Sequence, residues 1–157
     1  MRSGVALLKQ PVHLLALGFG VGLVPVAPGT AATAAAGLAG WWLMPVPLPV
    51  RAALVAVLAL AGIRVCGESA RRLGAPDHPA VVWDEIVGFL AVTLVLPAEP
   101  LWWAAAFALF RLFDIAKPWP VGYLDRRVGG GLGIMLDDLA AAGLAAICVV
   151  VGRLAVA

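Results

Sequence analysis

Charged residues are scarce in this chain of 157 residues. They make up 13% of the sequence, whereas ordinary soluble proteins carry about 25%. Hydrophobic residues make up 63%, and the mean hydropathy is +1.02, which is typical of an integral membrane protein. A chain of this length corresponds to one domain. We therefore expect a single membrane-embedded domain over residues 1–157.

Features that indicate other classes of function are missing. The net charge is only +2 and no basic stripe with interleaved aromatic residues occurs, so no nucleic-acid partner is expected. Neither a P-loop sequence nor a Gly-x-Ser-x-Gly nucleophile sequence is present. The two histidines and two cysteines are too scattered for a zinc site. Cys66 and Cys148 lie in apolar segments, and we expect both to be buried free thiols.

Proline and glycine residues divide the rest of the sequence into five apolar segments that predict helices. The segments span residues 30–44, 51–66, 82–97, 101–116 and 134–154. The second is expected to continue as an amphipathic helix to Arg72. Several segments are shorter than the ~20 residues that a full membrane span requires. The predicted fold is an all-α integral membrane bundle of about five apolar helices.

The N-terminal apolar run precedes these helices and differs from them in its glycines. Gly18, Gly20 and Gly22 stand at alternate positions, and two prolines follow. Glycine and proline weaken a straight helix. We expect this part of the chain to form a re-entrant or interfacial segment.

The basic residues predict the orientation in the membrane, because cytoplasmic loops carry an excess of Lys and Arg. With a cytoplasmic N-terminus and five crossings, only Arg51 and Arg153 fall outside. The basic residues that fall inside are Arg2, Lys9, Arg64, Arg71, Arg72, Arg111, Lys117, Arg126 and Arg127. The same topology places Trp41 and Trp103, with their tryptophan neighbours, at the far ends of their segments, where aromatic belts are expected.

Five acidic residues fall at the cytoplasmic ends of the predicted segments. Asp84 and Glu85 begin the third segment, Asp114 ends the fourth, and Asp137 and Asp138 begin the fifth. A carboxylate within a bilayer costs roughly 2.5–3.5 kcal/mol on insertion scales, so such residues are functional candidates. Neighbours on a helix point about 100° apart, so we expect one member of each adjacent pair to face the site directly.

Clustered carboxylates repel one another unless a cation neutralises them. Carboxylate and water ligands favour Mg²⁺, Mn²⁺ or Ca²⁺, and Mg²⁺ is the usual partner where phosphate is bound. The pattern therefore predicts a Mg²⁺ site at the cytoplasmic face. The alternative is stabilisation of helix N-termini, worth about 0.3–1 kcal/mol for each acid.

Two cations flank Asp114 at spacings of three residues, which place Arg111, Asp114 and Lys117 roughly along one helix face. Arg can bind a phosphate group with two hydrogen bonds, and Lys acts as a compact charge. We therefore predict that Arg111 and Lys117 bind phosphate. The alternative is an ordinary intrahelical ion pair with a basic residue at the helix C-terminus.

Four further residues are secondary candidates. Gly130 and Gly131 belong to a glycine-rich stretch whose backbone N–H groups could approach an anion, or which could be a flexible turn; both interpretations stay open. Thr30 is placed to cap a helix start. His13 lies in an apolar run without a neighbouring nucleophile, so a structural role is favoured.

Five stretches of the sequence resemble the phosphatidylglycerophosphatase A family. They are His13-Leu-Leu-Ala-Leu-Gly-Phe-Gly-Val-Gly, Ala27-Pro-Gly-Thr, Val82-Trp-Asp-Glu-Ile-Val-Gly, the segment from Phe110 to Pro120, and Gly130-Gly-Leu-Gly-Ile-Met-Leu-Asp-Asp. The resemblance runs from about Val12 to the last predicted helix, in the family's order and spacing.

This resemblance implies a magnesium-dependent lipid phosphatase of the bacterial inner membrane. Such enzymes hydrolyse phosphatidylglycerophosphate to phosphatidylglycerol and inorganic phosphate. The five acids would then be the catalytic and metal-binding site, open to the cytoplasm, and Arg111 and Lys117 would lie beside the phosphate. Membrane lipids are the expected surroundings, and the sequence leaves the oligomeric state open.

Two alternatives remain open from the residues alone. The first is a small cation-coupled transporter or channel, which would distribute acids through the depth of the membrane rather than gather them at one end. The second is a phosphatase of another lipid phosphate. Attack by water and attack by an aspartate, with an aspartyl-phosphate intermediate, are both compatible with the sequence.

Overall fold

The computed structural model describes residues 4–75 and 78–156, and every regular element in this part of the chain is helical. The elements are α1 (Gly4–Leu7), α2 (Pro11–Ala16), the 3₁₀ helix η1 (Gly18–Leu23), α3 (Pro28–Trp42), α4 (Leu48–Leu73), α5 (Trp83–Thr93), α6 (Pro100–Ala116), α7 (Val121–Arg127) and α8 (Gly130–Val156). The predicted all-α class is confirmed. Arg2, one of the residues used to predict the orientation, lies outside the described residues.

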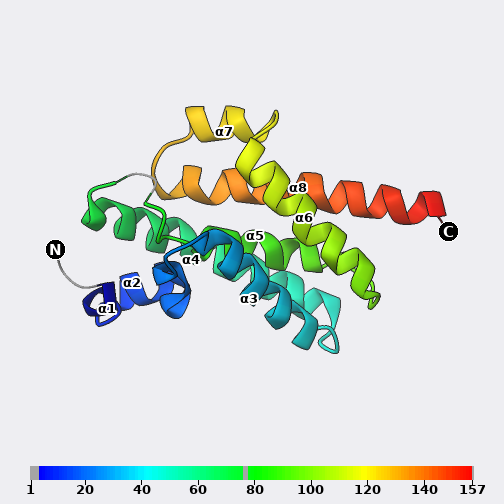
Figure 1. Ribbon diagram of the computed structural model, residues 1–157, viewed down its shortest axis with the longest axis horizontal. Helices are drawn as coiled ribbons and strands as arrows, with labels where there is room; N and C mark the ends of the chain where they lie inside the picture. The colour runs from blue at the N-terminus through cyan, green and yellow to red at the C-terminus, as the bar shows by residue number, and fades with distance from the viewer. Residues whose placement is uncertain (1–3, 76–77, 157) are drawn as a thin grey trace.

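Five of these helices run lengthwise through the molecule in alternating directions (Figure 1). Helices α3, α5 and α8 run one way, and α4 and α6 return between them. The N-terminus of α5, the C-terminus of α6 and the first turns of α8 therefore lie toward one end. This alternation is the arrangement that the five apolar segments predict, and it explains how acids far apart in the sequence reach the same end.

The predicted helix boundaries agree closely with α3, α4 and α6. The amphipathic extension of the second segment is confirmed, since α4 continues for 26 residues to Leu73. The third segment is shorter than expected, because α5 ends at Thr93 after 11 residues. Thr93 donates a hydrogen bond from its Oγ1 to the carbonyl oxygen of Leu90, at 2.7 Å.

The connection between α6 and α8 differs from the sequence prediction in two ways. Residues expected in a loop form α7, and the glycine-rich stretch expected before the last helix is its first turn, because α8 begins at Gly130. Glycine costs up to about 1 kcal/mol in a helix, but this position needs it. A Cβ atom on Gly131 would overlap the backbone of Ile63 and Gly67 in α4. Small residues allow membrane helices to approach closely.

The N-terminal segment is broken, as its glycines predict. Short helices α1 and α2 lead into η1, where Phe19 and Gly20 have left-handed backbone angles of φ 57° and 105°. The segment is tied to α4 by a hydrogen bond of 2.8 Å between His13 Nδ1 and Ser69 Oγ. Its location at a membrane interface stays a prediction.

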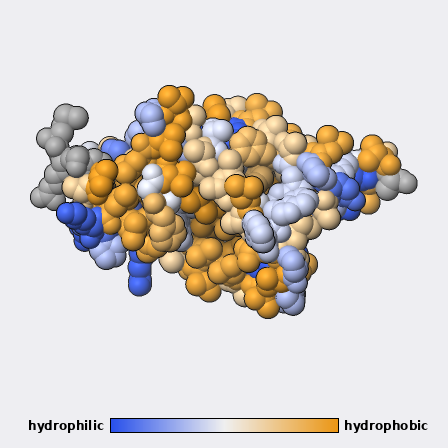
Figure 2. Space-filling model, turned by 60° about the horizontal axis from the view of Figure 1, so that its bottom comes forward, coloured by the Kyte–Doolittle hydropathy of each residue, from blue (hydrophilic) through white to orange (hydrophobic). Residues whose placement is uncertain are grey.

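Two of the described helices, α4 and α8, are long and apolar enough to cross a membrane. Helices α3, α5 and α6 have 15, 11 and 17 residues, so each is shorter than a standard span of ~20 residues. The face shown in Figure 2 is mostly hydrophobic, and its hydrophilic residues gather mainly toward the two ends.

Aromatic residues from α5 and α6 form the centre of the core. Phe89 and Phe110 are fully buried, with ring centroids 5.7 Å apart. At the far end of the bundle, the rings of Trp41 and Trp103 pack edge to face with their centroids 5.1 Å apart. This proximity agrees with the sequence prediction that both residues lie at the far ends of their segments. Cys66 is buried as predicted, but Cys148 is exposed.

Candidate functional site

One cleft, of about 320 Å³, collects all seven residues that the sequence singles out as the primary site. We call it the acidic cleft. It is lined by the start of α3, the first turn of α5, the end of α6 and the third turn of α8. The seven residues are Asp84, Glu85, Arg111, Asp114, Lys117, Asp137 and Asp138. Their convergence follows from the alternating helix directions.

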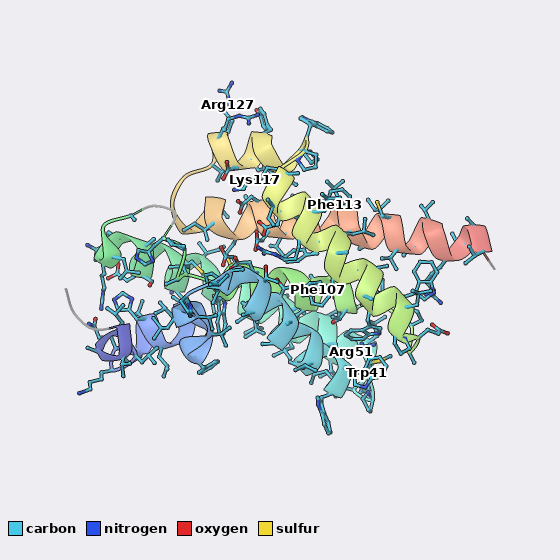
Figure 3. All side chains as sticks on the ribbon, viewed as in Figure 1. Trp41, Arg51, Phe107, Phe113, Lys117 and Arg127 are labelled. Atoms are coloured by element: carbon cyan, nitrogen blue, oxygen red, sulfur yellow. The ribbon has the colours of Figure 1, made fainter. Side chains whose placement is uncertain are left out.

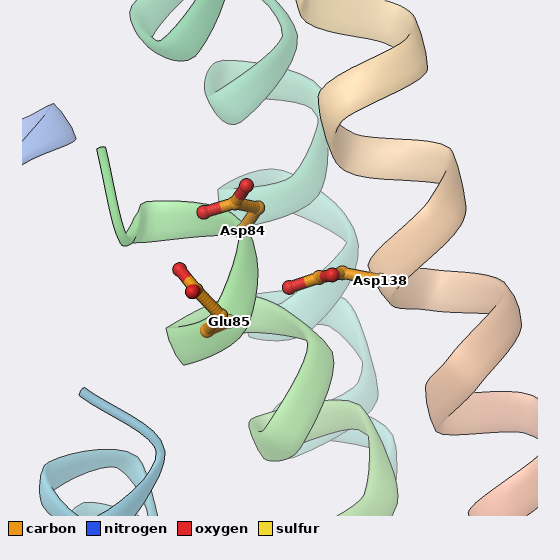
Figure 4. A group of neighbouring side chains, drawn as sticks. All are labelled: Asp84, Glu85 and Asp138. Carbon is orange, nitrogen blue, oxygen red and sulfur yellow. The ribbon is translucent and has the colours of Figure 1, made fainter. Parts of the chain in front are cut away.

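Three of the carboxylates form a tight cluster between α5 and α8 (Figure 4). Asp84, Glu85 and Asp138 each offer a ligand oxygen, and these atoms all lie within 4.8 Å of one another. One oxygen of each of the three side chains is buried without a hydrogen-bond partner among the described residues. We call these residues the three-carboxylate cluster.

This cluster fits a hard divalent cation. A buried carboxylate without a partner is costly, and three together add mutual repulsion. Oxygens bound to one Mg²⁺ lie about 2.0–2.1 Å from it, and therefore up to ~4.2 Å apart. The observed spacing, within 4.8 Å, needs only small side-chain adjustments to reach that arrangement. The donor set is entirely carboxylate oxygen, which favours Mg²⁺ over softer metals.

The other two acids of the cleft have cationic partners. Arg111 donates a hydrogen bond from Nη1 to Asp114 Oδ2 at 2.5 Å, which is the intrahelical ion pair considered as an alternative. The same nitrogen lies 3.8 Å from Glu85 Oε1, too far for a hydrogen bond. Arg111 Nε is buried and has no partner in the described part of the chain. The Nε–H edge of the guanidinium group is therefore available as a hydrogen-bond donor.

Lys117 links the end of α6 to α7 and α8. Its Nζ donates to Asp125 Oδ1 at 2.5 Å and to Asp137 Oδ2 at 2.8 Å. Partial burial disfavours its charged form, but the hydrogen bonds to the two carboxylates prevail and raise the pKa of Lys117 above its ordinary value. Lys117 is therefore a permanent cation at the rim of the cleft.

Both members of each adjacent acidic pair line the cleft, and which member of each pair is the direct ligand stays a prediction. The longer side chain of Glu85 reaches the space that Asp84 also faces. Asp137 accepts a hydrogen bond at 3.0 Å from the backbone N–H of Asp138 and turns toward Lys117. Helix N-terminal stabilisation remains available to the pair on α5, but Asp137 and Asp138 lie two turns inside α8.

The backbone of the cleft is unusual at two residues. Ala27, which precedes α3, and Lys117, which ends α6, both adopt left-handed conformations, with φ of 49° and 45°. Such conformations cost of order 1–3 kcal/mol and often occur at functional sites. Between them, Gly29 brings the start of α3 against the α5 and α6 side chains, because a Cβ there would overlap Glu85 Oε1 and lie 3.2 Å from Arg111 Nη1.

None of the four secondary candidates lines the acidic cleft, although Gly130 shares a neighbouring cavity with Asp84 and Asp137. His13 is buried against Ser69, and burial together with nearby Arg72 lowers its pKa, which supports the structural interpretation. Thr30 is not the cap of α3: the N-cap is Ala27, without a side-chain cap hydrogen bond. Gly131 packs on α4, whereas Gly130 lines a neighbouring cavity of about 140 Å³.

Two contributors to the site are not among the predicted site residues. The sequence shows Asp125 as a sixth acidic residue near the mouths of the apolar segments, in a predicted loop; in the structure it lies on α7 and completes the partners of Lys117. Gly29 allows α3 to approach Glu85. The Ala-Pro-Gly-Thr sequence around it was a signal for this contact, because a glycine just inside a helix start permits a close approach.

Comparison with known proteins gives consistent results. The family model for phosphatidylglycerophosphatase A matches residues 14–153. Phosphatidylglycerophosphatase A of Escherichia coli (strain K12) is 41% identical over 136 residues, covering 85% of this chain and 78% of the relative. The enzyme of that name from Haemophilus influenzae is 43% identical over 145 residues, covering 90% and 88%.

A third relative carries a different name. A putative phosphatidylinositol-3-phosphatase from Bacteroides thetaiotaomicron is 38% identical over 157 residues, covering 93% of this chain and 98% of the relative. No solved structure matches the chain. The family model spans nearly the whole sequence, including every residue of the acidic cleft. This chain belongs to the phosphatidylglycerophosphatase A family.

Proposed function

We propose that the acidic cleft is the active site of a magnesium-dependent phosphatase that hydrolyses phosphatidylglycerophosphate to phosphatidylglycerol and inorganic phosphate. Family membership supports the phosphatase activity and the lipid substrate. The observation that carries the metal-dependent mechanism is the three-carboxylate cluster, whose buried oxygens have no partner in the described residues.

Asp84, Glu85 and Asp138 would hold the ion. Bound there, Mg²⁺ would supply charge neutralisation and polarisation of a phosphoryl oxygen. A test that does not depend on activity is thermal unfolding: a ligand present at 100 times its Kd stabilises the folded state by about 2.7 kcal/mol. Magnesium should therefore raise the unfolding temperature, and Glu99→Gln, an exposed acid before α6, should keep that shift.

Arg111 and Lys117 bind the phosphate in this proposal. The unpartnered Nε of Arg111 and the fixed positive charge of Lys117 face the same cleft as the cluster. Phosphoryl transfer is catalysed mainly by positioning and charge stabilisation. The two cations would offset the negative charge that grows on the transferring group, and their ion pairs with Asp114 and Asp137 hold them in place.

The phosphate ester is cleaved by one of two routes that the cleft residues support. In the first, a water oxygen attacks phosphorus, the bond between phosphorus and the lipid glycerol oxygen breaks, a cleft carboxylate takes the water's proton, and the leaving oxygen takes a proton from solvent. In the second, an aspartate oxygen attacks phosphorus and the same bond to the glycerol oxygen breaks, with that oxygen again protonated from solvent. Water then hydrolyses the acyl phosphate to inorganic phosphate and the free aspartate. Trapping with hydroxylamine distinguishes them, because only the second produces an aspartyl hydroxamate.

The membrane placement is also part of the proposal. Helices α3, α5 and α6 would cross or enter the bilayer of the inner membrane together with α4 and α8, shielded by these longer neighbours. The acidic cleft would then open at the cytoplasmic face, where most Lys and Arg residues gather. The acyl chains of the substrate would stay in the bilayer. Acids gathered at one end fit this arrangement better than an ion path through the membrane.

The direct test uses purified protein in detergent micelles containing phosphatidylglycerophosphate. We expect release of one phosphate per phosphatidylglycerol formed with Mg²⁺, none in EDTA, and recovery when Mg²⁺ is restored. Asp114→Asn should lower the rate strongly, whereas Glu99→Gln should not. Phosphate release that persists in EDTA contradicts the metal-dependent mechanism, and a rate unaffected by Asp114→Asn contradicts the role of the Arg111–Asp114 pair.

A second candidate substrate follows from the Bacteroides thetaiotaomicron relative, which is named for a phosphoinositide. The same experiment with phosphatidylinositol 3-phosphate tests it. Both substrates present a phosphate monoester on a lipid headgroup, so the cluster and the two cations would serve either one. We expect a higher kcat/KM for phosphatidylglycerophosphate, because the relatives named for that substrate are 41% and 43% identical to this chain, against 38%.

A further inference from the structure

An apolar groove of about 420 Å³ runs along the bundle between α3 and α6, with Phe89 of α5 among its lining residues. The lining residues are Ala34, Gly37, Leu38, Trp41, Phe89, Pro100, Trp103 and Phe107. Figure 3 shows Phe107 partway along α6, Lys117 at its cleft end, and Trp41 at the far end of α3. The volume falls within the ~300–1,000 Å³ of small-molecule sites.

This groove and the acidic cleft are both lined by residues of the same three helices, α3, α5 and α6. Glu85 and Arg111 lie 3.8 Å apart across α5 and α6. One helical turn farther from the cleft on each helix, the rings of Phe89 and Phe107 lie against each other with centroids 6.0 Å apart. Residues four apart share a helix face, so the charged pair and the aromatic pair form successive levels of one surface.

Helix α3 shows the same continuity through its glycines. Gly29 lies against Glu85, and two turns later Gly37 lies against Phe89, whose ring would be 3.2 Å from a Cβ placed there. The two close approaches keep α3 against α5 from the cleft to the groove. The groove and the cleft are separate cavities that share no lining residue, and they follow one another along these helices.

We propose that this groove binds one acyl chain of the lipid whose phosphate occupies the acidic cleft. The inference rests on the proposed function, because the phosphate in the cleft and the acyl chain in the groove would belong to the same lipid molecule. From Gly29 to Trp41 the helix advances about 18 Å at 1.5 Å per residue. One leaflet of a bilayer has a hydrocarbon thickness of about half of ~30 Å, so the distance from the cleft to the far end of the groove matches the depth that an acyl chain spans.

A lipid suits this surface better than a second copy of the chain. The occupant must be apolar along the groove and anionic at the end that holds Arg111, and a phospholipid phosphate combines both in one molecule. The edge-to-face pair of Trp41 and Trp103 lies at the far end, where the tip of the acyl chain would lie against it. This proposal places the pair at the depth of the acyl-chain tip, and not in the aromatic belt at the opposite interface that the sequence predicts.

The groove acts by orientation rather than by added hydrophobic energy. The free energy of an acyl chain changes little when it moves from the bilayer into an apolar groove, since lipid tails are as apolar as the groove's side chains. Holding the chain between α3 and α6 fixes the approach of the phosphate to the cleft, and displacements of about 1 Å can cost 10²-fold in rate. The groove would therefore favour acylated substrates over deacylated ones.

The test fills the groove and compares two substrates. Ala34→Trp places a large ring in it at an exposed position, and Ala39→Trp makes the same change at an exposed position of α3 outside it. The measured quantity is the ratio of kcat/KM for long-chain phosphatidylglycerophosphate to that for its deacylated headgroup. We expect Ala34→Trp to lower this ratio about tenfold and Ala39→Trp to keep it. A ratio unchanged by Ala34→Trp would overturn the proposal.

A second measurement uses the unsubstituted protein and does not depend on the folding of a variant. A lipid phosphate with a photoreactive diazirine in its acyl chain should label α3 and α6 at the groove residues, and unlabelled substrate should compete. Labelling elsewhere, or dimer formation that buries the groove and excludes the lipid, contradicts it. If the unsubstituted protein hydrolyses neither substrate, the proposed function fails; if it hydrolyses both and only the groove tests fail, the groove proposal alone is rejected.

Discussion

The two sides of the acidic cleft differ in how their carboxylates are neutralised. On the side formed by α6 and α7, Asp114 pairs with Arg111, and Asp137 of α8 pairs with Lys117. On the side formed by α5 and α8, the three-carboxylate cluster has buried oxygens without partners in the described residues. Five carboxylates against two cations leave three negative charges. Under the proposed function, the first side is complete in the protein and the second would be completed by an ion.

The largest expected effect comes from a change in the cluster. Asp138→Asn keeps the shape of the side chain but removes one charge from the cation site. We expect kcat to fall about a thousandfold or more, equivalent to roughly 4 kcal/mol of transition-state stabilisation. Steady-state phosphate release with Mg²⁺ measures this effect.

Thermal unfolding of Asp138→Asn sharpens the same comparison. In EDTA the variant should unfold at a higher temperature than the unsubstituted protein, because one repulsive charge is gone. With Mg²⁺ the order should reverse, since the unsubstituted protein gains the ion. Identical unfolding temperatures under both conditions would show that the cluster does not bind the ion.

A smaller effect is expected on the paired side. Arg111→Lys preserves the charge but removes the planar group that binds carboxylate and phosphate with two hydrogen bonds. Loss of one such donor typically costs about 10²–10³ in kcat, and we expect the lower end. The stabilisation by Mg²⁺ should persist in this variant. A variant that loses the Mg²⁺ shift as well would mean that the two sides of the cleft are not separable.

Lys117→Gln should have a moderate effect. It leaves Asp125 and Asp137 without their cation and removes one of two positive charges from the cleft. We expect kcat/KM to fall about tenfold, less than for Arg111, because Lys acts as a point charge without bidentate geometry. Lys117→Arg should recover part of the loss. Equal activities for the Gln and Arg variants would contradict a role for the charge.

The smallest predicted effect concerns stability alone. Gly131→Ala places a methyl group against the backbone of α4, and overpacking typically costs 1–3 kcal/mol. Gly143→Ala in the same helix has open space around it and should be neutral or stabilise by up to about 1 kcal/mol. Denaturation in mild detergent compares the two. If Gly131→Ala were as stable as Gly143→Ala, the close contact with α4 would not explain the glycine stretch. The alternative of a flexible segment that approaches a ligand would then be favoured.

Much of the fold follows from the positions of proline and glycine in an apolar sequence. The helices α3, α4 and α6 begin and end within a few residues of their predicted limits, because proline and polar residues mark both ends. The glycine-rich stretch was wrongly predicted to lie before the last helix, because helix propensity disfavours glycine. The close contact of Gly131 with α4 explains why glycine occurs in the first turn of α8. Helix α7 was missed because Pro118, Pro120 and Gly122 are typical of a loop.

The sequence predicts that the site residues lie together, but not which of them form ion pairs. Alternating apolar segments place Asp84, Asp114 and Asp138 at one end of the bundle whatever the packing details. Which acid receives a cation depends on tertiary geometry. Lys117 leaves the face of α6 at a left-handed residue and turns to Asp125 and Asp137, which spacing of three residues does not reveal.

The account depends on a cation site made by α5 and α8, and direct ion binding tests it. Mn²⁺, as a paramagnetic substitute for Mg²⁺, can be titrated into the purified protein and its free concentration followed by electron paramagnetic resonance. We predict saturable binding that Mg²⁺ displaces, that Asp84→Asn and Asp138→Asn abolish, and that Glu99→Gln leaves unchanged. Binding that survives both cluster substitutions would contradict the account.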